Sequence, residues 1–225
     1  MARRIIDLST PVRTGHFRWP VKRHKLKSHA SGDVSEASWL GWPVHGFTHL
    51  DAARHFAPDG PTTDDLALDT VIGEAAVVDV SAAGRNGAIE EAMVAAAGAH
   101  VRAGDIVLMR AAWDTVASID TPEFWSTAPF MTAEACRWLL ARGIKAIGYD
   151  FPQDYCIRDL VTGDRVPARE ENTTHVELLL QGVTMIEYLC NLGAIPGLRT
   201  EFFALPLNVP ACDGAPVRAI AIESD

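Results

Sequence analysis

Residues 44–56 read Val-His-Gly-Phe-Thr-His-Leu-Asp-Ala-Ala-Arg-His-Phe, which places His45, His49, Asp51 and His55 within eleven residues. The whole chain of 225 residues has only eight histidines, so this stretch is unusually rich in them. Imidazole nitrogen and carboxylate oxygen suit Zn²⁺, Mn²⁺ or Fe²⁺, and a site without thiolates is more often catalytic than structural. The stretch therefore predicts a metal-dependent enzyme.

The spacing of these four residues favours an extended backbone. In a strand, side chains at odd-numbered positions point to one face, whereas on a helix His45 and His49 align but Asp51 turns away. Gly46 and Thr48 are compatible with a bend that lets several donors reach one ion. We therefore expect the four side chains to lie on one face of a bent strand or tight loop.

A second pair of ligand-type residues, His175 and Glu187, lies downstream. Thr174 and Glu177 match a capping box, which predicts a short helix that begins at His175 and ends near Gly182. On one continuous helix the pair would be about 18 Å apart, so a reversal at Gly182 is needed to bring them together. A carboxylate among hydrophobic neighbours, as Glu187 is, is costly to bury unless it is paired or bound to a metal.

The rest of the pattern predicts a mixed α/β fold in one domain spanning residues 1–225, with a strand-rich core and flanking helices. No internal repeat or linker divides the chain. Apolar runs predict strands at residues 5–8, 76–80, 106–109, 146–149, 183–186, 202–206 and 217–222. Helices are expected at residues 88–97 and at residues 132–140, the second capped by Thr132.

Residues 9–43 are expected to be irregular, and aromatic side chains on a long loop often line or cover a site. Asp150 and Asp154, after a predicted strand, are either turn formers or supports for ligands and substrate. The candidates for the substrate pocket are Phe17, Trp19, Trp39, Trp42, Phe47, Asp150 and Gln153.

The same segment holds a basic patch, which is interpreted as a solvated loop or as a flap that attracts an acidic substrate or partner. Its members are Arg18, Lys22, Arg23, Lys25 and Lys27, with His24 and His29.

Composition limits the function classes. A net charge of -9 repels a phosphate backbone, which argues against nucleic-acid binding. No apolar stretch approaches the ~20 residues that span a bilayer, so no membrane partner is expected. The start of the chain carries no recognisable export signal, and its four cysteines form no C-x-x-C motif. A cytoplasmic location is therefore expected.

The combined motifs resemble the cyclase-like family of metal-dependent hydrolases that includes bacterial kynurenine formamidase and isatin hydrolase. Its signature is similar to H-x-G-T-H-x-D-x-P-x-H, which stands here as residues 45–55. The resemblance extends over nearly the whole chain. It includes Ile6-Asp-Leu-Ser, Gly104-Asp-Ile-Val-Leu-Met-Arg, Gly148-Tyr-Asp, the spacing from His175 to Glu187, Leu205-Pro-Leu and Gly214-Ala-Pro-Val-Arg.

The resemblance implies a swivelling β/β/α fold and a homo-oligomer, either a homodimer or a homotetramer. It implies that His45, His49 and Asp51 bind a first divalent ion, Zn²⁺ or Mn²⁺, and that Asp51 bridges to a second ion where one is present. His175 and Glu187 complete the second set, and the role of His55 is then that of an acid–base catalyst.

Three positions depart from the family pattern. Phe47 stands where glycine is usual before the threonine, and Ala53 replaces the proline. Gln153 replaces a serine that often follows the strand-end aspartate. The first two departures affect loop geometry, and the third affects the pocket.

The expected activity is hydrolysis of the C–N bond of a small aryl formamide, lactam or similar amide by metal-activated water. One alternative is a metal-dependent cyclase or lyase that acts through an enolate. The other is a catalytically inactive module that binds a metal or a small ligand.

Overall fold

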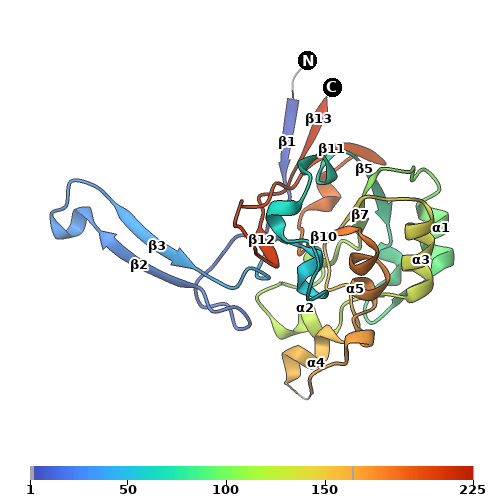
Figure 1. Ribbon diagram of the computed structural model, residues 1–225, viewed down its shortest axis with the longest axis horizontal. Coiled ribbons are helices and arrows are strands. Elements are labelled where there is room, and N and C mark those ends of the chain that lie inside the picture. The colour runs from blue at the N-terminus through green and yellow to red at the C-terminus, as the bar shows by residue number, and fades with distance from the viewer. Residues whose placement is uncertain (1–2, 164, 225) are drawn as a thin grey trace.

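In the computed structural model, which describes residues 3–163 and 165–224, nine strands form one mixed sheet in the order β1-β13-β11-β5-β7-β9-β10-β4-β12 (Figure 1). Four neighbouring strands, β5, β7, β9 and β10, run parallel, and the strands on either side of them pair antiparallel. The bounds are β1 Arg3–Asp7, β4 His49–Asp51, β5 Ile72–Asp79, β7 Ile106–Arg110, β9 Ala146–Tyr149, β10 Thr184–Glu187, β11 Arg199–Phe203, β12 Gly214–Pro216 and β13 Ile220–Ser224.

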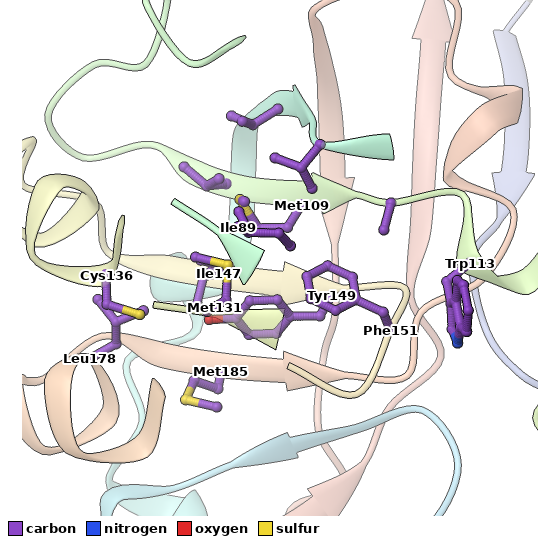
Figure 2. Packing of buried hydrophobic residues seen from close by; sticks show 14 of the residues in the cluster. Ile89, Met109, Trp113, Met131, Cys136, Ile147, Tyr149, Phe151, Leu178 and Met185 are labelled. Carbon is purple, nitrogen blue, oxygen red and sulfur yellow. The ribbon is translucent and has the colours of Figure 1, made fainter. Parts of the chain in front are cut away.

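Short helices cover one face of the parallel strands. Met109 of β7, Tyr149 of β9 and Met185 of β10 are buried together with Cys136 of α3 and with Leu178 (Figure 2). The α-helices of the described residues are α1 Glu91–Ala97, α2 Pro122–Ser126, α3 Ala133–Ala141, α4 Ile157–Thr162 and α5 Thr173–Glu177. None of them has the length and apolarity that a membrane crossing requires.

The opposite face of the same strands is also buried. Val77 of β5, Leu108 of β7 and Ile186 of β10 join a second apolar cluster with Leu8 and Phe202. Strands that are buried on both faces carry nearly continuous apolar runs, which explains why the sequence pattern located them well. The predicted mixed α/β class with a strand-rich core is confirmed.

Two predictions of local structure need correction. The helix expected at residues 88–97 begins only at Glu91, because β6 (Ala88–Ile89) pairs in parallel with β8 (Phe130–Met131). Residues 45–55 do not form one strand, since regular β-structure there is limited to His49–Asp51. In both places backbone pairing with a distant segment decides the local structure.

The expectation that residues 9–43 are irregular is also wrong in part. β2 (Lys22–Lys27) and β3 (Ala37–Gly41) form an antiparallel hairpin, which we call the arm. Figure 1 shows the arm projecting away from the body of the molecule. Five residues of the basic patch, including Lys22 and Lys27, lie on the fully exposed strand β2 rather than on a loop.

Candidate metal centre

Three of the predicted ligands lie side by side on adjacent strands. His49 and Asp51 are two residues apart on β4, so their side chains share one face. β10 pairs antiparallel with β4 in a register that sets Glu187 opposite His49, and β12 pairs with the other edge of β4. Directly opposed residues have Cβ atoms about 4.5–5.5 Å apart, so sheet register alone brings the three donors together.

His45 and His55 reach the same place from turns on either side of β4. His45 lies four residues before the strand, and His55 closes the short 3₁₀ turn Ala53–His55. Their rings stack with centroids 3.8 Å apart, and His45 Nδ1 lies 2.7 Å from Asp51 Oδ1. The expected convergence is therefore present. Of the bent strand or tight loop that we predicted, the structure has a short strand, His49–Asp51, between two turns.

Phe47 explains how the chain turns into β4. Its φ of 60° is in the left-handed region, where the family pattern has a glycine and where a side chain carries a strain of about 1–3 kcal/mol. Its ring is buried in the core, which compensates for that strain. Its carbonyl accepts the Nδ1–H of His49 at 2.8 Å. That bond leaves His49 Nε2 to face Asp51 at 3.2 Å and Glu187 at 3.7 Å.

Asp154 orients His175 from behind. Its Oδ2 accepts the Nδ1–H of His175 at 2.6 Å, and its Oδ1 accepts the Thr174 amide at 2.7 Å. The other ring nitrogen, Nε2, faces Asp51 at 3.5 Å and Glu187 at 3.6 Å. A carboxylate that fixes the far nitrogen of a ligand histidine is a recurring support in metal sites.

The predicted capping box before His175 is wrong. α5 begins at Thr173 with Asn172 at its N-cap, so Thr174 and His175 are both inside the helix. Glu177 does not reach back to the cap but pairs with Arg137 on α3, because α5 packs against α3. The predicted reversal at Gly182 is present, with a φ of 89° that glycine tolerates.

Sequence reasoning missed Asp213, which comes just before β12. Its Oδ2 accepts a hydrogen bond from His45 Nε2 at 2.7 Å and lies 3.8 Å from His55 Nδ1. Gly214 permits this approach, because a Cβ there would lie 2.7 Å from the His45 ring. The available signal was the position of Asp213 directly before the Gly-Ala-Pro-Val-Arg motif.

Burial and the neighbouring charges shift the pKa values of the ionisable groups in this cluster. Burial raises the pKa of Asp51, but its histidine neighbours outweigh this and hold the pKa well below its ordinary value. Burial and the charge of Asp51 both raise the pKa of Glu187. Burial lowers the pKa of His45, but hydrogen bonds to Asp51 and Asp213 outweigh it and raise this pKa to about 9. Burial lowers the pKa of His55 to about 4.

The residues fit a divalent cation. His49 Nε2 and Asp51 Oδ2 are buried and have no hydrogen-bond partner among the described residues, as expected of atoms that face an ion. In three groups the donor atoms lie within 4.8 Å of one another: His45/His49/Asp51, Asp51/His55/His175 and His45/His55/Asp213. Glu187 adds a carboxylate next to the first two groups. Nitrogen and oxygen donors of this kind suit borderline and hard divalent metals.

A cavity of about 330 Å³ opens over these donors. Its walls include apolar side chains of α4 and of the segment that follows, among them Ile157, Leu160 and Val166. Tyr188 and Arg18 complete the lining on the side of the N-terminal segment. Ile157, Leu160, Val166 and Tyr188 were not predicted, because they are single residues in unremarkable local patterns. Arg18 belongs to the basic patch, for which a flap that attracts an acidic substrate was one of the two interpretations.

The predicted aromatic pocket residues lie elsewhere. Phe17 is 46% exposed, and Trp39 stacks on His24 in the arm. Trp19 and Phe47 are buried in the main core, where Trp19 contacts the back of Tyr188. Trp42 borders a different cavity, next to Thr48 and Val217.

The two polar pocket candidates are buried supports. Asp150 accepts the amides of Ala111 and Ala112 at 2.8 and 3.0 Å and does not line the cavity. Gln153 donates its side-chain amide to Glu187, so it holds this carboxylate in place from behind. Substitution of the family serine by Gln153 therefore affects a proposed ligand rather than the pocket wall.

Comparison with known proteins finds a matching family model and a similar enzyme. A family model described as a putative cyclase matches residues 6–153. The kynurenine formamidase of Erythrobacter litoralis is 32% identical over an alignment that covers 98% of this chain and 94% of the relative.

Solved structures share the fold. Isatin hydrolase A from Labrenzia aggregata, bound to benzyl benzoate, has a TM-score of 0.79 at 20% identity and covers 99% of this chain and 94% of that chain. An isatin hydrolase bound to the product analogue thioisatinate has a TM-score of 0.81 at 22% identity, with 99% and 93% covered.

Proposed function

This chain belongs to the cyclase family, and on that premise we propose that it is a metal-dependent hydrolase that cleaves the C–N bond of a small amide. The observation that carries the proposal is the convergence of buried nitrogen and oxygen donors beneath a cavity large enough for one aromatic ring system. The kynurenine formamidase relative points to an aryl formamide, and the isatin hydrolase fold relatives point to a lactam as the related substrate.

Five side chains hold the metal in this proposal, namely His45, His49, Asp51, His175 and Glu187. A divalent ion held by these residues would lower the pKa of a bound water toward roughly 7 and would polarise the substrate carbonyl. Asp154, Gln153 and the Phe47 carbonyl fix the orientation of three of these ligands. Zn²⁺ and Mn²⁺ would both be compatible with this donor set, and Asp51, which lies next to both His49 and His175, would be available to a second ion as well.

His55 is the proposed acid–base catalyst. It lines the cavity between His45 and His175, with ring centroids 3.8 and 5.6 Å away, and its side chain is 30% exposed. Its imidazole takes a proton from the attacking water and delivers one to the departing nitrogen. The apolar side chains of Ile157, Leu160 and Val166, which line the cavity, form the contact surface for the aryl ring.

Turnover in ¹⁸O-labelled water tests the reaction class. We expect the metal-loaded protein to hydrolyse a formanilide or a lactam and to place the label in the released carboxylate, because water supplies the new C–O bond. Mass spectrometry of the product is the measurement, and protein stripped with a chelator is the control. Turnover without label would instead support the cyclase or lyase, and no turnover with Zn²⁺ or Mn²⁺ would support a binding module.

We further propose that the protein is a homodimer, or a homotetramer built from such dimers, in which the arm contacts a second copy. Isolated two-stranded hairpins are marginally stable in water, yet the arm exposes Leu26, Trp39 and Leu40 by 63%, 44% and 47%. The positive side chains of β2 complement a chain with a net charge of -9.

The four free cysteines are consistent with the reducing cytoplasm as its location.

The double variant Leu26→Glu/Leu40→Glu is expected to weaken self-association by at least about tenfold, since it puts two acidic groups on the apolar contact surface. Sedimentation equilibrium measures the dissociation constant. Leu198→Glu, which alters an apolar residue that is 58% exposed outside the arm, is the matched control. A wild-type monomer, or an arm variant that associates like the wild type, would refute the arm as the contact.

A further inference from the structure

Arg18 is the basic side chain that lines the cavity above the donor cluster. It comes from the segment before the arm, between the exposed Phe17 and the buried Trp19. Its guanidinium carbon lies 4.2 Å from the ring centroid of Trp125, and Trp125 in turn packs edge-on against Tyr188 at 5.0 Å. The same carbon lies 5.9 Å from the ring centroid of Trp19, so the rings of Trp125 and Trp19 hold this cation at the cavity wall.

The guanidinium has no anionic partner in the described part of the chain. Arg18 Nη1 is buried and makes no hydrogen bond there, whereas several other arginines of this protein are paired with carboxylates. Arg137 and Arg199, for example, each contact a carboxylate at 2.6–2.7 Å. A buried donor on a charged group without a partner is costly, so its retention in a cavity points to a ligand that satisfies it.

We propose that Arg18 is a specificity-determining residue that binds a carboxylate on the substrate. The assignment rests on the amide hydrolysis proposed above and adds a substrate class to it, namely aryl amides with an anionic group. The aryl ring then lies on the wall of α4, the scissile carbonyl lies at the donor cluster, and the carboxylate lies at Arg18. The guanidinium is suited to this role because it presents a planar pair of N–H donors to the two carboxylate oxygens.

The test compares two formanilides, one with a ring carboxylate and one with an uncharged carboxamide at the same ring position. Arg18→Met keeps the apolar stem and its packing on Trp125 but removes the charge. We expect it to raise KM for the carboxylate substrate about tenfold to a hundredfold, as for loss of a charged hydrogen bond, with kcat little changed. KM for the carboxamide is expected to stay within about twofold. Arg18→Lys is expected to restore part of the difference.

Arg142→Met is the matched control, because Arg142 also stacks on a tryptophan, 4.4 Å from the Trp138 ring, but does not line the cavity. Equal effects of Arg18→Met on both substrates, or no effect on either, would overturn the assignment. If wild-type protein turned over neither substrate, the proposed function would fail. Calorimetric binding of the same two compounds to metal-loaded wild type and Arg18→Met would then decide the role of Arg18 separately.

Discussion

Replacement of His49 by alanine is expected to abolish both tight metal binding and turnover. His49 is fully buried at the centre of the donor cluster, with Nε2 facing Asp51 and Glu187 and without a hydrogen-bond partner of its own. Loss of an outer support of a metal ligand typically lowers affinity by about 10–100-fold. Because His49 is itself a proposed ligand, we expect His49→Ala to lose more metal affinity than this. We expect turnover to fall by at least the same factor.

Metal content of purified protein, measured by inductively coupled plasma mass spectrometry, and a competition titration with a chelator check this expectation. Circular dichroism shows whether the variant is folded, and His49→Gln serves as a second variant that keeps a polar side chain of similar size. His100→Ala is the control, because His100 belongs to none of the donor groups. Folded His49→Ala and His49→Gln variants that both retained stoichiometric metal would refute the proposed centre.

The central strands were predictable because they are buried on both faces, which leaves long apolar runs in the sequence. The arm was not, since its strands carry exposed charges such as Lys22 and Lys27 and are defined by pairing with each other. The helix at residues 88–97 was misplaced for a related reason. Ala88–Ile89 pairs with a strand some forty residues away, and tertiary pairing overrides local helix propensity.

The donor cluster was predicted through its residue types and spacing, and Asp154, which was expected either to form a turn or to support a ligand, does support His175. The other supports were not predicted. Asp213 and Tyr188 lie at positions whose roles depend on strand register and on turns, which one sequence does not reveal. Two of the aromatic residues proposed for the pocket, Trp19 and Phe47, are instead buried in the core. Arg18, a charged residue next to Trp19, faces the cavity.

His55 is placed so that it could act either as a metal ligand or as an acid–base catalyst. It belongs to a donor group with Asp51 and His175, which would suit a ligand. However, its 30% exposed side chain lines the cavity and faces the outer carboxylate of Asp213. Glu187, by contrast, is buried and lies 3.7 and 3.6 Å from the Nε2 atoms of His49 and His175. A proton carrier must reach both water and substrate, so this partly open position favours acid–base catalysis over metal binding.

His55→Ala is therefore expected to lower kcat by about 10²–10⁴-fold, the usual contribution of a positioned acid–base group, while metal content stays at the wild-type level. Steady-state kinetics on a formanilide and metal analysis of the same preparation give the two readouts. The contrast with His49→Ala is decisive, because a ligand and a proton carrier reduce turnover alike but differ in metal retention. Metal loss from His55→Ala as severe as from His49→Ala would make His55 a ligand and would leave Glu187 in a supporting role.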